Sequence, residues 1–371
     1  MILPVLIMYF SNVIEAQQTV TGSILHGGIN RTYRLRLPAN FNKVIAIPMV
    51  FNFHGFGSNA LEQEFYTGMN SVADTAGFAV CYPQGIGNAW NVGWAFGSSA
   101  DDVGLTSALI EDLNIKYGFD KNRIYSCGMS NGGFMSYTLA CELNNKIAAI
   151  ASVTGSMVPE KIGGCKPGRP VPVMEIHGNA DSTVLYTGSP IAVSIPDVLN
   201  FWKVNNGCDA QPIKEMVPNV NSFDDSTAER YTYVNCTENN EVIHYKIIGG
   251  AHSWPGSIIQ IGVTNNDFNA SATIWRFFKK YSLNKPTSIV EPITAENISI
   301  FPNPCYDEVI IDMGLTAYAK MCIISIHGNL IRSQLLTNGQ NRINTSHLPA
   351  GMYIININGG KENKSYKLTK I

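Results

Sequence analysis

Apolar runs and amphipathic segments alternate along residues 45–281. Short apolar runs of the kind found in buried strands occur at 45–53, 78–82, 123–127, 147–153, 171–177 and 242–248. Longer segments with helical periodicity occur at 61–76, 102–117, 131–143, 194–206 and 267–281. This alternation predicts an α/β fold in which a mostly parallel sheet carries helices on both faces. Asp102 is expected to cap the second of these helices.

The pattern changes near residue 284, where a segment with proline and serine, 284–297, is expected to be a linker. Beyond the linker, turn sequences rich in Pro, Asn and Gly separate short alternating strands, which are expected at 298–301, 308–312, 319–326 and 351–357. Short strands at even spacing predict a small β-sandwich over residues 298–371. The α/β domain would then occupy residues 17–283.

The first 16 residues differ from both of these regions. Met1 to Ile14 is short and apolar, and Glu15-Ala16 precedes the polar pair Gln17-Gln18. This arrangement is typical of a signal peptide, here residues 1–16, that is cleaved after Ala16. A first core strand and an interfacial helix are the alternatives for this segment.

Composition narrows the class of protein. A chain of 371 residues with 45% hydrophobic residues can bury a large core and form two domains. The formal net charge is −2 and no basic run occurs, so no nucleic-acid partner is expected. Eight cysteines fit an oxidising compartment, and no Cys/His spacing has the form of a zinc site. No metal is therefore expected.

The motif Gly128-Met129-Ser130-Asn131-Gly132 is the most informative about chemistry. It follows the strand expected at 123–127 and opens the helix expected at 131–143. A G-x-S-x-G sequence between a strand and a helix is typical of a nucleophile elbow, a sharp turn that exposes the serine hydroxyl. Ser130 is therefore the candidate nucleophile. A glycine-rich turn with an incidental serine is the alternative.

A serine nucleophile needs a base, and the base needs an acid that orients it. Asp181 follows the strand expected at 171–177, and His252 follows the strand expected at 242–248. Both lie past the carboxyl ends of strands, where open α/β sheets build their sites. The chain order Ser, Asp, His is that of α/β-hydrolases. Ser130, Asp181 and His252 therefore form the expected catalytic triad.

The remaining histidines fit the role of base less well. His177 and His244 lie within strands, where packing or backbone hydrogen bonds explain them. His54 opens a loop after an apolar strand, at the position that supplies one oxyanion-hole N–H in α/β-hydrolases. We expect the backbone amides of Phe56 and Asn131 to stabilise the charge that develops in the transition state. The His54 ring is expected to support this loop.

Three tryptophans lie near the expected site. Trp90 and Trp94 occupy a Gly- and Asn-rich loop after the strand at 78–82, and Trp254 follows His252 closely. We expect all three to bind substrate as a flat aromatic wall. Packing within the core is the alternative for each of them.

Six motifs carry a resemblance to a known family: HGFG at 54–57, WNVGW at 90–94, DDVG at 101–104, GMSNGG at 128–133, HGNAD at 177–181 and GGAHSWPG at 249–256. In order and spacing they resemble the secreted esterases of the poly(3-hydroxybutyrate) depolymerase family, and related feruloyl and acetylxylan esterases share the pattern. The resemblance spans about residues 20–283 and implies an α/β-hydrolase fold and ester hydrolysis without a cofactor. After the first His-Gly, this chain has Phe56, whereas many polymer-degrading relatives have Cys or Ser at that position.

The cysteine count alone allows 105 pairings. The resemblance supports a disulfide between Cys208 and Cys236, which bracket a polar loop. The other expectations are a second candidate pair, Cys141 and Cys165, and buried free thiols at Cys81 and Cys127.

The last 80 or so residues resemble the C-terminal sorting domain of type IX secretion, through FPNP at 301–304, GMYIININ at 351–358 and the terminal Lys367-Leu368-Thr369-Lys370. This resemblance implies a secreted protein that contacts secretion machinery. The alternative is a carbohydrate-binding module, which would call for a row of exposed aromatic residues. The segment offers one phenylalanine and four tyrosines but no tryptophan.

These features together predict a secreted serine carboxylesterase that acts, as a monomer, on polymer-linked esters. The expected substrates are feruloyl or acetyl esters of plant or algal polysaccharide. Depolymerisation of polyhydroxybutyrate or another polyester is the alternative function. An inactive hydrolase that serves as a surface binding protein is a second alternative, and a peptidase of the same fold is a weaker rival.

Overall fold

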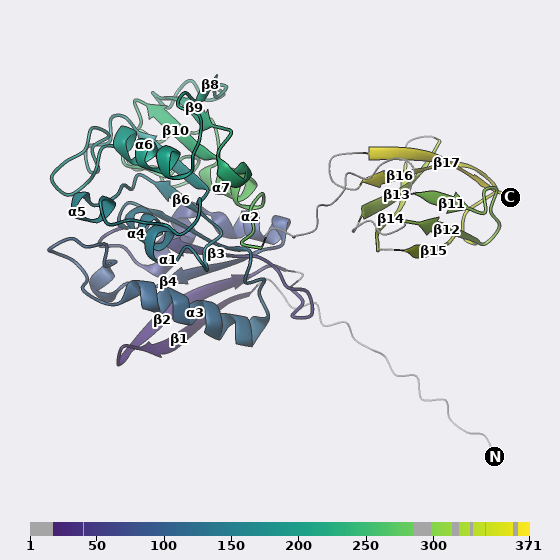
Figure 1. Cartoon of the computed structure of the whole chain (residues 1–371), viewed down its shortest axis with the longest axis horizontal. Helices are drawn as coiled ribbons and strands as arrows, with labels where there is room; N and C mark the ends of the chain where they lie inside the picture. Colours follow the sequence, from purple (N-terminus) through teal and green to yellow (C-terminus); the bar gives the residue numbers. More distant parts are fainter. Residues whose placement is uncertain are drawn as a thin grey trace, which may run out of the picture. The chain divides into compact units, whose positions relative to one another are not determined.

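The computed structural model describes residues 18–39, 41–284, 298–313, 319–326, 329–337, 339–358 and 363–371. The chain divides into two compact units, Met1–Asn284 and Lys285–Ile371 (Figure 1). The expected signal peptide at 1–16, and the expected linker beyond its first residue, lie outside the described residues. Among the described residues, none of the helices is both long and apolar enough to cross a membrane.

A ten-stranded sheet organises the first unit. Its strands, in spatial order, are β1 (Gln18–His26), β2 (Ile29–Leu37), β4 (Ala79–Pro83), β3 (Met49–Phe53), β5 (Ile124–Met129), β6 (Ala149–Val153), β7 (Val173–Gly178), β10 (Val242–Ile248), β9 (Thr227–Tyr233) and β8 (Ile213–Met216). Neighbouring strands from β4 to β10 are parallel, whereas β1 and β2 on one edge and β9 and β8 on the other pair antiparallel. The mostly parallel sheet is confirmed.

Helices cover both faces of this sheet, as expected. One face carries α3 (Asp102–Tyr117), α4 (Asn131–Glu142) and α6 (Ile195–Asn205), whose buried side chains join one core cluster. The other face carries α1 (Ala60–Thr67), α2 (Met69–Ala76) and α7 (Ala270–Phe278) with a second cluster. The short helix α5 (Pro159–Ile162) and the 3₁₀ turns η1 (Ile86–Asn88) and η2 (Thr237–Asn239) lie in connections.

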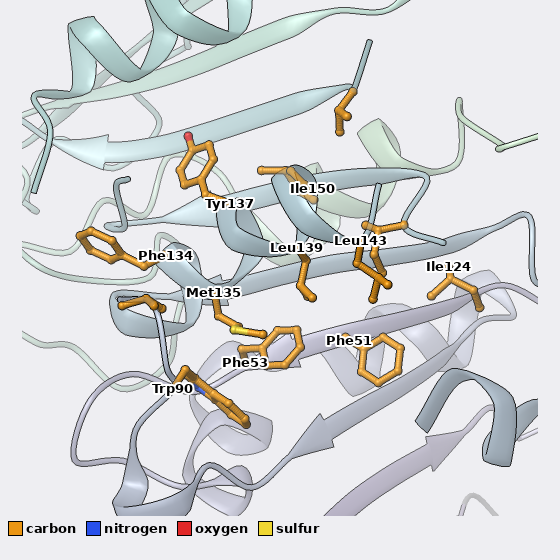
Figure 2. Close-up of a cluster of buried hydrophobic side chains, with 14 of the residues drawn as sticks. Phe51, Phe53, Trp90, Ile124, Phe134, Met135, Tyr137, Leu139, Leu143 and Ile150 are labelled. Atoms are coloured by element: carbon orange, nitrogen blue, oxygen red, sulfur yellow. The ribbon is translucent and has the colours of Figure 1, made fainter. Parts of the chain in front are cut away.

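Strand β3 is apolar except for Asn52. All five residues are buried, because successive side chains point to opposite faces and both faces are covered. Phe51 and Phe53 belong to the cluster under α4, whereas Val50 belongs to the cluster under α1 and α2. Figure 2 shows Met135 and Leu139 of α4 pointing toward Phe53.

Two helices differ from their expected bounds. The segment expected to be one helix at 61–76 is split at Gly68, which adopts a left-handed conformation with φ 57° between α1 and α2. A residue with a side chain resists that conformation, so glycine permits the break. The helix expected at 267–281 is shorter, because the Asn269 side chain caps it by accepting a hydrogen bond from Ala272 N–H.

Asp102 does not cap α3, which corrects the expectation. The neighbouring Asp101 caps the helix by accepting from Gly104 N–H at 2.8 Å. The Asp102 carboxylate is buried, with Oδ1 2.5 Å from Nη2 of Arg31 in β2 and Oδ2 accepting from Asn91 N–H at 2.7 Å. Burial raises the pKa of Asp102, and these two partners oppose that rise. The carboxylate therefore joins β2, the loop before α3 and α3 itself.

The second unit consists of two antiparallel sheets. Three strands form one sheet, in the order β11 (Ser299–Phe301), β12 (Glu308–Asp312) and β15 (Gln340–Asn344). Four strands form the other, in the order β14 (Leu330–Leu336), β13 (Ala319–Ser325), β16 (Gly351–Asn358) and β17 (Asn363–Lys370). Their inward side chains share one apolar core, which includes Val309, Ile323 and Ile355. The expected small β-sandwich is confirmed.

The cysteines follow the expected pattern. Both expected disulfides are present, Cys208–Cys236 and Cys141–Cys165. Cys81 and Cys127 are free thiols buried in β4 and β5. In the second unit, Cys305 is free and buried, and Cys322 is free and half-buried.

The buried pair predicts a large stability effect. Arg31→Met should lower the free energy of unfolding by about 3–5 kcal/mol, because it leaves the Asp102 carboxylate buried without its counter-charge. Lys116→Met is the control, since the Lys116–Asp112 pair is half exposed and should contribute less than about 1 kcal/mol. Urea titration followed by circular dichroism measures both. Equal losses in the two variants would contradict the structural role of Arg31.

Candidate active site

Ser130 occupies a strained turn between β5 and α4. Its backbone has φ 54° and ψ −122°, a conformation that side-chain-bearing residues rarely adopt and that costs on the order of 1–3 kcal/mol. A Cβ on Gly128 would lie 2.5 Å from the Gly132 carbonyl carbon, and a Cβ on Gly132 would clash with the Phe53 carbonyl. The two glycines therefore let α4 begin directly against the end of β3, which is the geometry of a nucleophile elbow.

Asp181 and His252 lie on the loops after β7 and β10, which are parallel neighbours in the sheet. The loops touch through their backbones, because a Cβ on Gly178 would lie 2.5 Å from the Gly250 carbonyl carbon. This contact brings His252 Nδ1 to 2.7 Å from Asp181 Oδ2. The other carboxylate oxygen, Oδ1, accepts from the N–H groups of Thr183 and Val184 at 2.8 and 2.9 Å.

Asp181 is held as a carboxylate. Burial works to raise its pKa, but the hydrogen bond from His252, the charges of His252 and His177, and the Val184 N–H outweigh burial and lower it. A carboxylate in contact with Nδ1 requires a proton on that nitrogen, so His252 Nε2 is left free to accept one. The pair therefore has the geometry of a base and its orienting acid.

Ser130 and His252 line the same pocket. Within residues 41–284, neither Ser130 Oγ nor His252 Nε2 forms a hydrogen bond. Such contacts are often long in unliganded hydrolases and shorten when substrate binds. The structure thus brings the three residues of the expected triad to one place, with the Asp–His contact closed.

Phe56 and Asn131 lie beside Ser130, where the oxyanion hole is expected. A Cβ on Gly55 would be 3.5 Å from Ser130 Cβ, so the loop that carries Phe56 packs directly on the elbow. Asn131 is the first residue of α4, and the first N–H groups of a helix have no acceptor within the helix. The Asn131 side chain accepts from Trp90 N–H at 2.7 Å, which fixes the elbow to the loop after β4.

The His54 ring supports the loop of residues 54–57, which carries Phe56 and is called the oxyanion loop below, as expected. Its Nδ1 donates to the Gly55 carbonyl at 2.8 Å, and its Nε2 accepts from Gly85 N–H at 3.0 Å. One donor and one acceptor require a neutral ring. Burial lowers the pKa of His54 to about 4, so the ring stays neutral at physiological pH.

Trp90 and Trp254 do not line the pocket, which corrects the expectation that they form a substrate wall. Their exposed fractions are 1% and 0%. Trp90 Nε1 donates to the His54 carbonyl at 2.8 Å, and its ring meets Phe53 edge to face at 5.0 Å, which Figure 2 shows within the core. Trp254 Nε1 donates to Ser271 Oγ at 3.2 Å. Both indoles therefore hold the loops on which the site depends.

Trp94 lies differently. It is half-buried, its Nε1 donates to the Ile191 carbonyl at 2.9 Å, and its ring stacks on Phe96 with centroids 5.1 Å apart. Phe96 in turn meets Phe56 at 6.0 Å. Trp94 thus belongs to an aromatic row that reaches the oxyanion loop, and its role in substrate binding stays a prediction.

The pocket beside Ser130 has a volume of about 520 Å³ and is mainly apolar. The sequence did not identify the side chains of its wall, which come from α1 and from the loop after His252: Leu61, Phe65, Tyr66, Ile259 and Ile261. In the sequence these wall residues stand out only as apolar residues on the polar side of a helix or within a loop. Such residues can be assigned to a pocket only when both segments are seen together.

Tyr66 joins the pocket wall to the histidine loop. Its hydroxyl accepts from Trp254 N–H at 2.9 Å, and its carbonyl accepts from Ser257 Oγ at 2.8 Å. The loop that carries His252 is therefore fixed to α1 on one side and to the Asp181 loop on the other.

The scaffold role of Trp90 predicts that Trp90→Ala lowers the free energy of unfolding by about 3–5 kcal/mol, since it empties a fully buried indole site. Trp94→Ala, at a half-buried position in the same loop, should cost much less. Chemical denaturation monitored by fluorescence compares the two. If Trp90→Ala were the milder change, the indole would not be the packing element described here.

Comparisons with known proteins give two family matches and several relatives. The family described as Esterase PHB depolymerase matches residues 31–165, and the family described as Secretion system C-terminal sorting domain matches residues 299–370. The putative esterase NocK of Nocardia uniformis subsp. tsuyamanensis is 27% identical over 283 residues, which cover 69% of this chain and 81% of that protein. Feruloyl esterase B of Piromyces equi is 31% identical over 234 residues, or 59% of this chain and 42% of that protein.

The fold has a counterpart among solved structures. An acetyl xylan esterase from Aspergillus awamori superimposes with a TM-score of 0.52 over 70% of this chain and 99% of that chain, at 15% identity. At that identity the likeness concerns the fold alone. Residues 31–165 therefore match the PHB depolymerase esterase family, and residues 299–370 match the secretion-system C-terminal sorting domain.

Proposed function

We propose that this protein is a secreted serine carboxylesterase in which Ser130, Asp181 and His252 form the catalytic triad. The observation that carries the proposal is the 2.7 Å contact between His252 Nδ1 and Asp181 Oδ2, beside a pocket that also contains the strained Ser130. A serine in an elbow, a base and a buried acid together make up the machinery of acyl transfer.

The reaction proceeds through an acyl-enzyme. Ser130 Oγ attacks the ester carbonyl carbon while His252 Nε2 takes the hydroxyl proton. The tetrahedral intermediate then collapses, and His252 gives the proton to the leaving alcohol. Water enters, loses a proton to His252 and releases the carboxylic acid. Asp181 stabilises the imidazolium form of His252 in both halves of the reaction.

The oxyanion receives two backbone donors in this proposal. The Phe56 N–H belongs to the loop that packs on Ser130, and the Asn131 N–H belongs to the first residue of α4, directly after Ser130. A fixed donor of this kind is worth about 2.7–4 kcal/mol of transition-state stabilisation in serine hydrolases. The buried contacts of His54 and Trp90 hold the Phe56 segment in place before substrate arrives.

The proposed substrate is a feruloyl or acetyl ester of plant or algal polysaccharide. Support comes from the names of sequence relatives, among them feruloyl esterase B and a bifunctional acetylxylan esterase/xylanase of Neocallimastix patriciarum. The apolar wall of Leu61, Phe65 and Ile261 favours the larger, aromatic acyl group, because an acetyl group would leave most of the cavity filled with water. The ester is proposed to be polymer-linked, and the enzyme to act as a monomer.

Polyester depolymerisation is the second candidate, and one observation favours it. The pocket wall includes exposed apolar side chains, with Phe56 53%, Phe65 64% and Ile261 49% exposed. Contiguous exposed apolar surface marks a binding site for an apolar partner. A water-insoluble polyester would cover such a rim, whereas a soluble glycan would leave it in water.

Ser130→Ala should reduce ester hydrolysis by a factor on the order of 10⁴ or more while leaving the fold intact, because the glycines set the turn. Ser126→Ala is the control, since it removes a buried hydroxyl from the same strand, 2.8 Å from Ser136 Oγ and outside the pocket. It should keep most of the activity. Rates are measured on p-nitrophenyl acetate, methyl ferulate, acetylated xylan and hydroxybutyrate oligomers.

The same panel separates the candidates. Activity of the unaltered enzyme on ferulate or acetylated xylan supports the polysaccharide assignment, and activity on hydroxybutyrate oligomers alone promotes the polyester. Inactivity on every ester would leave the binding-protein alternative. Retained activity of Ser130→Ala would reject the nucleophile.

The C-terminal sorting domain supports export to the cell surface or the medium. We propose that residues 1–16 are removed as a signal peptide and that type IX machinery recognises the β-sandwich. The mature protein should therefore begin near Gln17 and lack most of residues 291–371. Intact-mass measurement of the exported protein checks this. A mature chain that still ends at Ile371 would indicate a retained binding module.

A further inference from the structure

A second cluster of polar groups lies beneath the proposed triad and has no part in the reaction described above. Glu175 and His177 are on β7, Tyr137 is on α4, and their exposed fractions are 0%, 1% and 1%. His177 Nδ1 is 2.9 Å from Glu175 Oε1, and Tyr137 Oη donates to Glu175 Oε2 at 2.7 Å. Burying a charged group destabilises a protein unless the group is paired. The buried Glu175 and His177 therefore need a role that explains their presence.

The hydrogen bonds of His177 determine its protons. Nε2 lies 2.8 Å from the Val184 carbonyl, which can only accept, so this nitrogen carries a hydrogen. Nδ1 faces the Glu175 carboxyl. Burial works to lower the pKa of His177, but the hydrogen bond and the charge of Glu175 outweigh it, and the pKa is raised. Burial also raises the pKa of the Glu175 carboxyl. In the proposal below, the proton between the two groups lies on His177 Nδ1, which makes His177 an imidazolium with Glu175 as its counter-ion.

The imidazolium touches the proposed catalytic acid. His177 Nε2 is 3.4 Å from Asp181 Oδ2, the same oxygen that accepts from His252 Nδ1 at 2.7 Å. Two histidines thus converge on one carboxylate oxygen, one from the core and one from the pocket. The positive charge of His177 is one of the causes that lower the pKa of Asp181.

The other titratable groups around His177 are Tyr186, His244 and Lys246. The Tyr186 ring meets the His177 ring edge to face, with centroids 6.0 Å apart. Lys246 Nζ lies over the Tyr186 ring, 5.2 Å from its centroid. His244 Nδ1 lies 3.2 Å from the Glu175 carbonyl. Burial lowers the pKa of His244 to about 3, so it stays neutral and adds no charge to the cluster.

We propose that His177, paired with Glu175, is a positioning residue that keeps Asp181 ionised and sets how strongly Asp181 stabilises protonated His252. The proposal rests on the triad proposed above. Because His177 shares Oδ2 with His252, it withdraws charge from the oxygen that supports the base. Removing the charge of His177 would make Asp181 more basic, and a more basic partner would stabilise the His252 imidazolium.

The sign of the effect on activity follows. His252 must be neutral to act as a base, so kcat/KM falls on the acid side as His252 becomes protonated. Stronger stabilisation of protonated His252 moves this acid limb to higher pH. We expect the acid limb to shift by about 0.5–1 pH unit. This is less than one charge would cause by acting directly on another at such a distance, because the effect of His177 on His252 passes through Asp181.

Glu175→Gln is the sharpest test, because the amide keeps the shape and can donate to His177 Nδ1 while it removes the counter-charge. His177 then loses its proton, since burial disfavours the cation. His177→Gln is the second variant, which removes the imidazole itself. His244→Gln is the matched control, a buried neutral histidine in the adjacent strand. The pH dependence of kcat/KM on p-nitrophenyl acetate is measured for all three, with circular dichroism to check folding.

The expected result is an acid limb displaced to higher pH in Glu175→Gln and in any folded His177→Gln protein, with the limb of His244→Gln unchanged. An unchanged limb in Glu175→Gln would overturn the proposal, whatever the change in rate. A lower rate without displacement would mean that the cluster only stabilises the fold. These outcomes are distinct from failure of the triad, which would show as retained activity in Ser130→Ala or Asp181→Asn.

Discussion

The site depends on one close approach of backbone to backbone, where the first turn of α4 meets the end of β3. Gly128 and Gly132 leave no room for a Cβ at this contact, so the helix begins against the Phe53 carbonyl and Ser130 takes a strained conformation. The strain is maintained because the surrounding core is filled: Phe53, Trp90 and Met135 pack beneath the turn. Packing and backbone hydrogen bonds together hold Ser130 in place, since its N–H donates to the Val153 carbonyl and its own carbonyl accepts from Gly133 and Phe134 N–H.

A layered electrostatic arrangement surrounds this turn. His252 borders the pocket, Asp181 lies behind it, and the buried Glu175–His177 pair lies behind Asp181. Burial destabilises each isolated charge. In the proposed charge state, neighbouring groups carry opposite signs, which offsets this destabilisation. On the other side of Ser130, the neutral His54 ring and the Trp90 indole fix the oxyanion loop without adding charge. Titratable groups thus lie behind His252, whereas neutral rings support the loop that carries Phe56.

Sequence patterns identified the residues at strand ends well, and the interior of the site poorly. The clustering of Ser130, Asp181 and His252 could be predicted because each follows an apolar strand and because a turn sequence marks it. Trp90 could not be placed, since glycine and asparagine in its loop suggested exposure, while the burial comes from Phe53 and His54, which are distant in sequence. Asp102 was assigned wrongly for the same reason. A helix cap is the local explanation of an aspartate at a helix start, whereas its actual partner Arg31 is 71 residues away in the sequence. The edge strands β8 and β9 were missed because exposed polar residues interrupt their pattern.

The Arg31–Asp102 contact sets a limit on the smallest active fragment. Arg31 belongs to the hairpin of β1 and β2 at one edge of the sheet, an element that contributes no residue to the triad. Asp102 nevertheless needs that guanidinium, and through Asn91 it holds the loop that carries Trp90. Trimming the hairpin away would leave every proposed catalytic residue in the chain, yet the oxyanion loop would lose the support behind it. In energetic terms, the domain that carries the proposed triad therefore begins at this hairpin, which contributes no residue to the pocket beside Ser130.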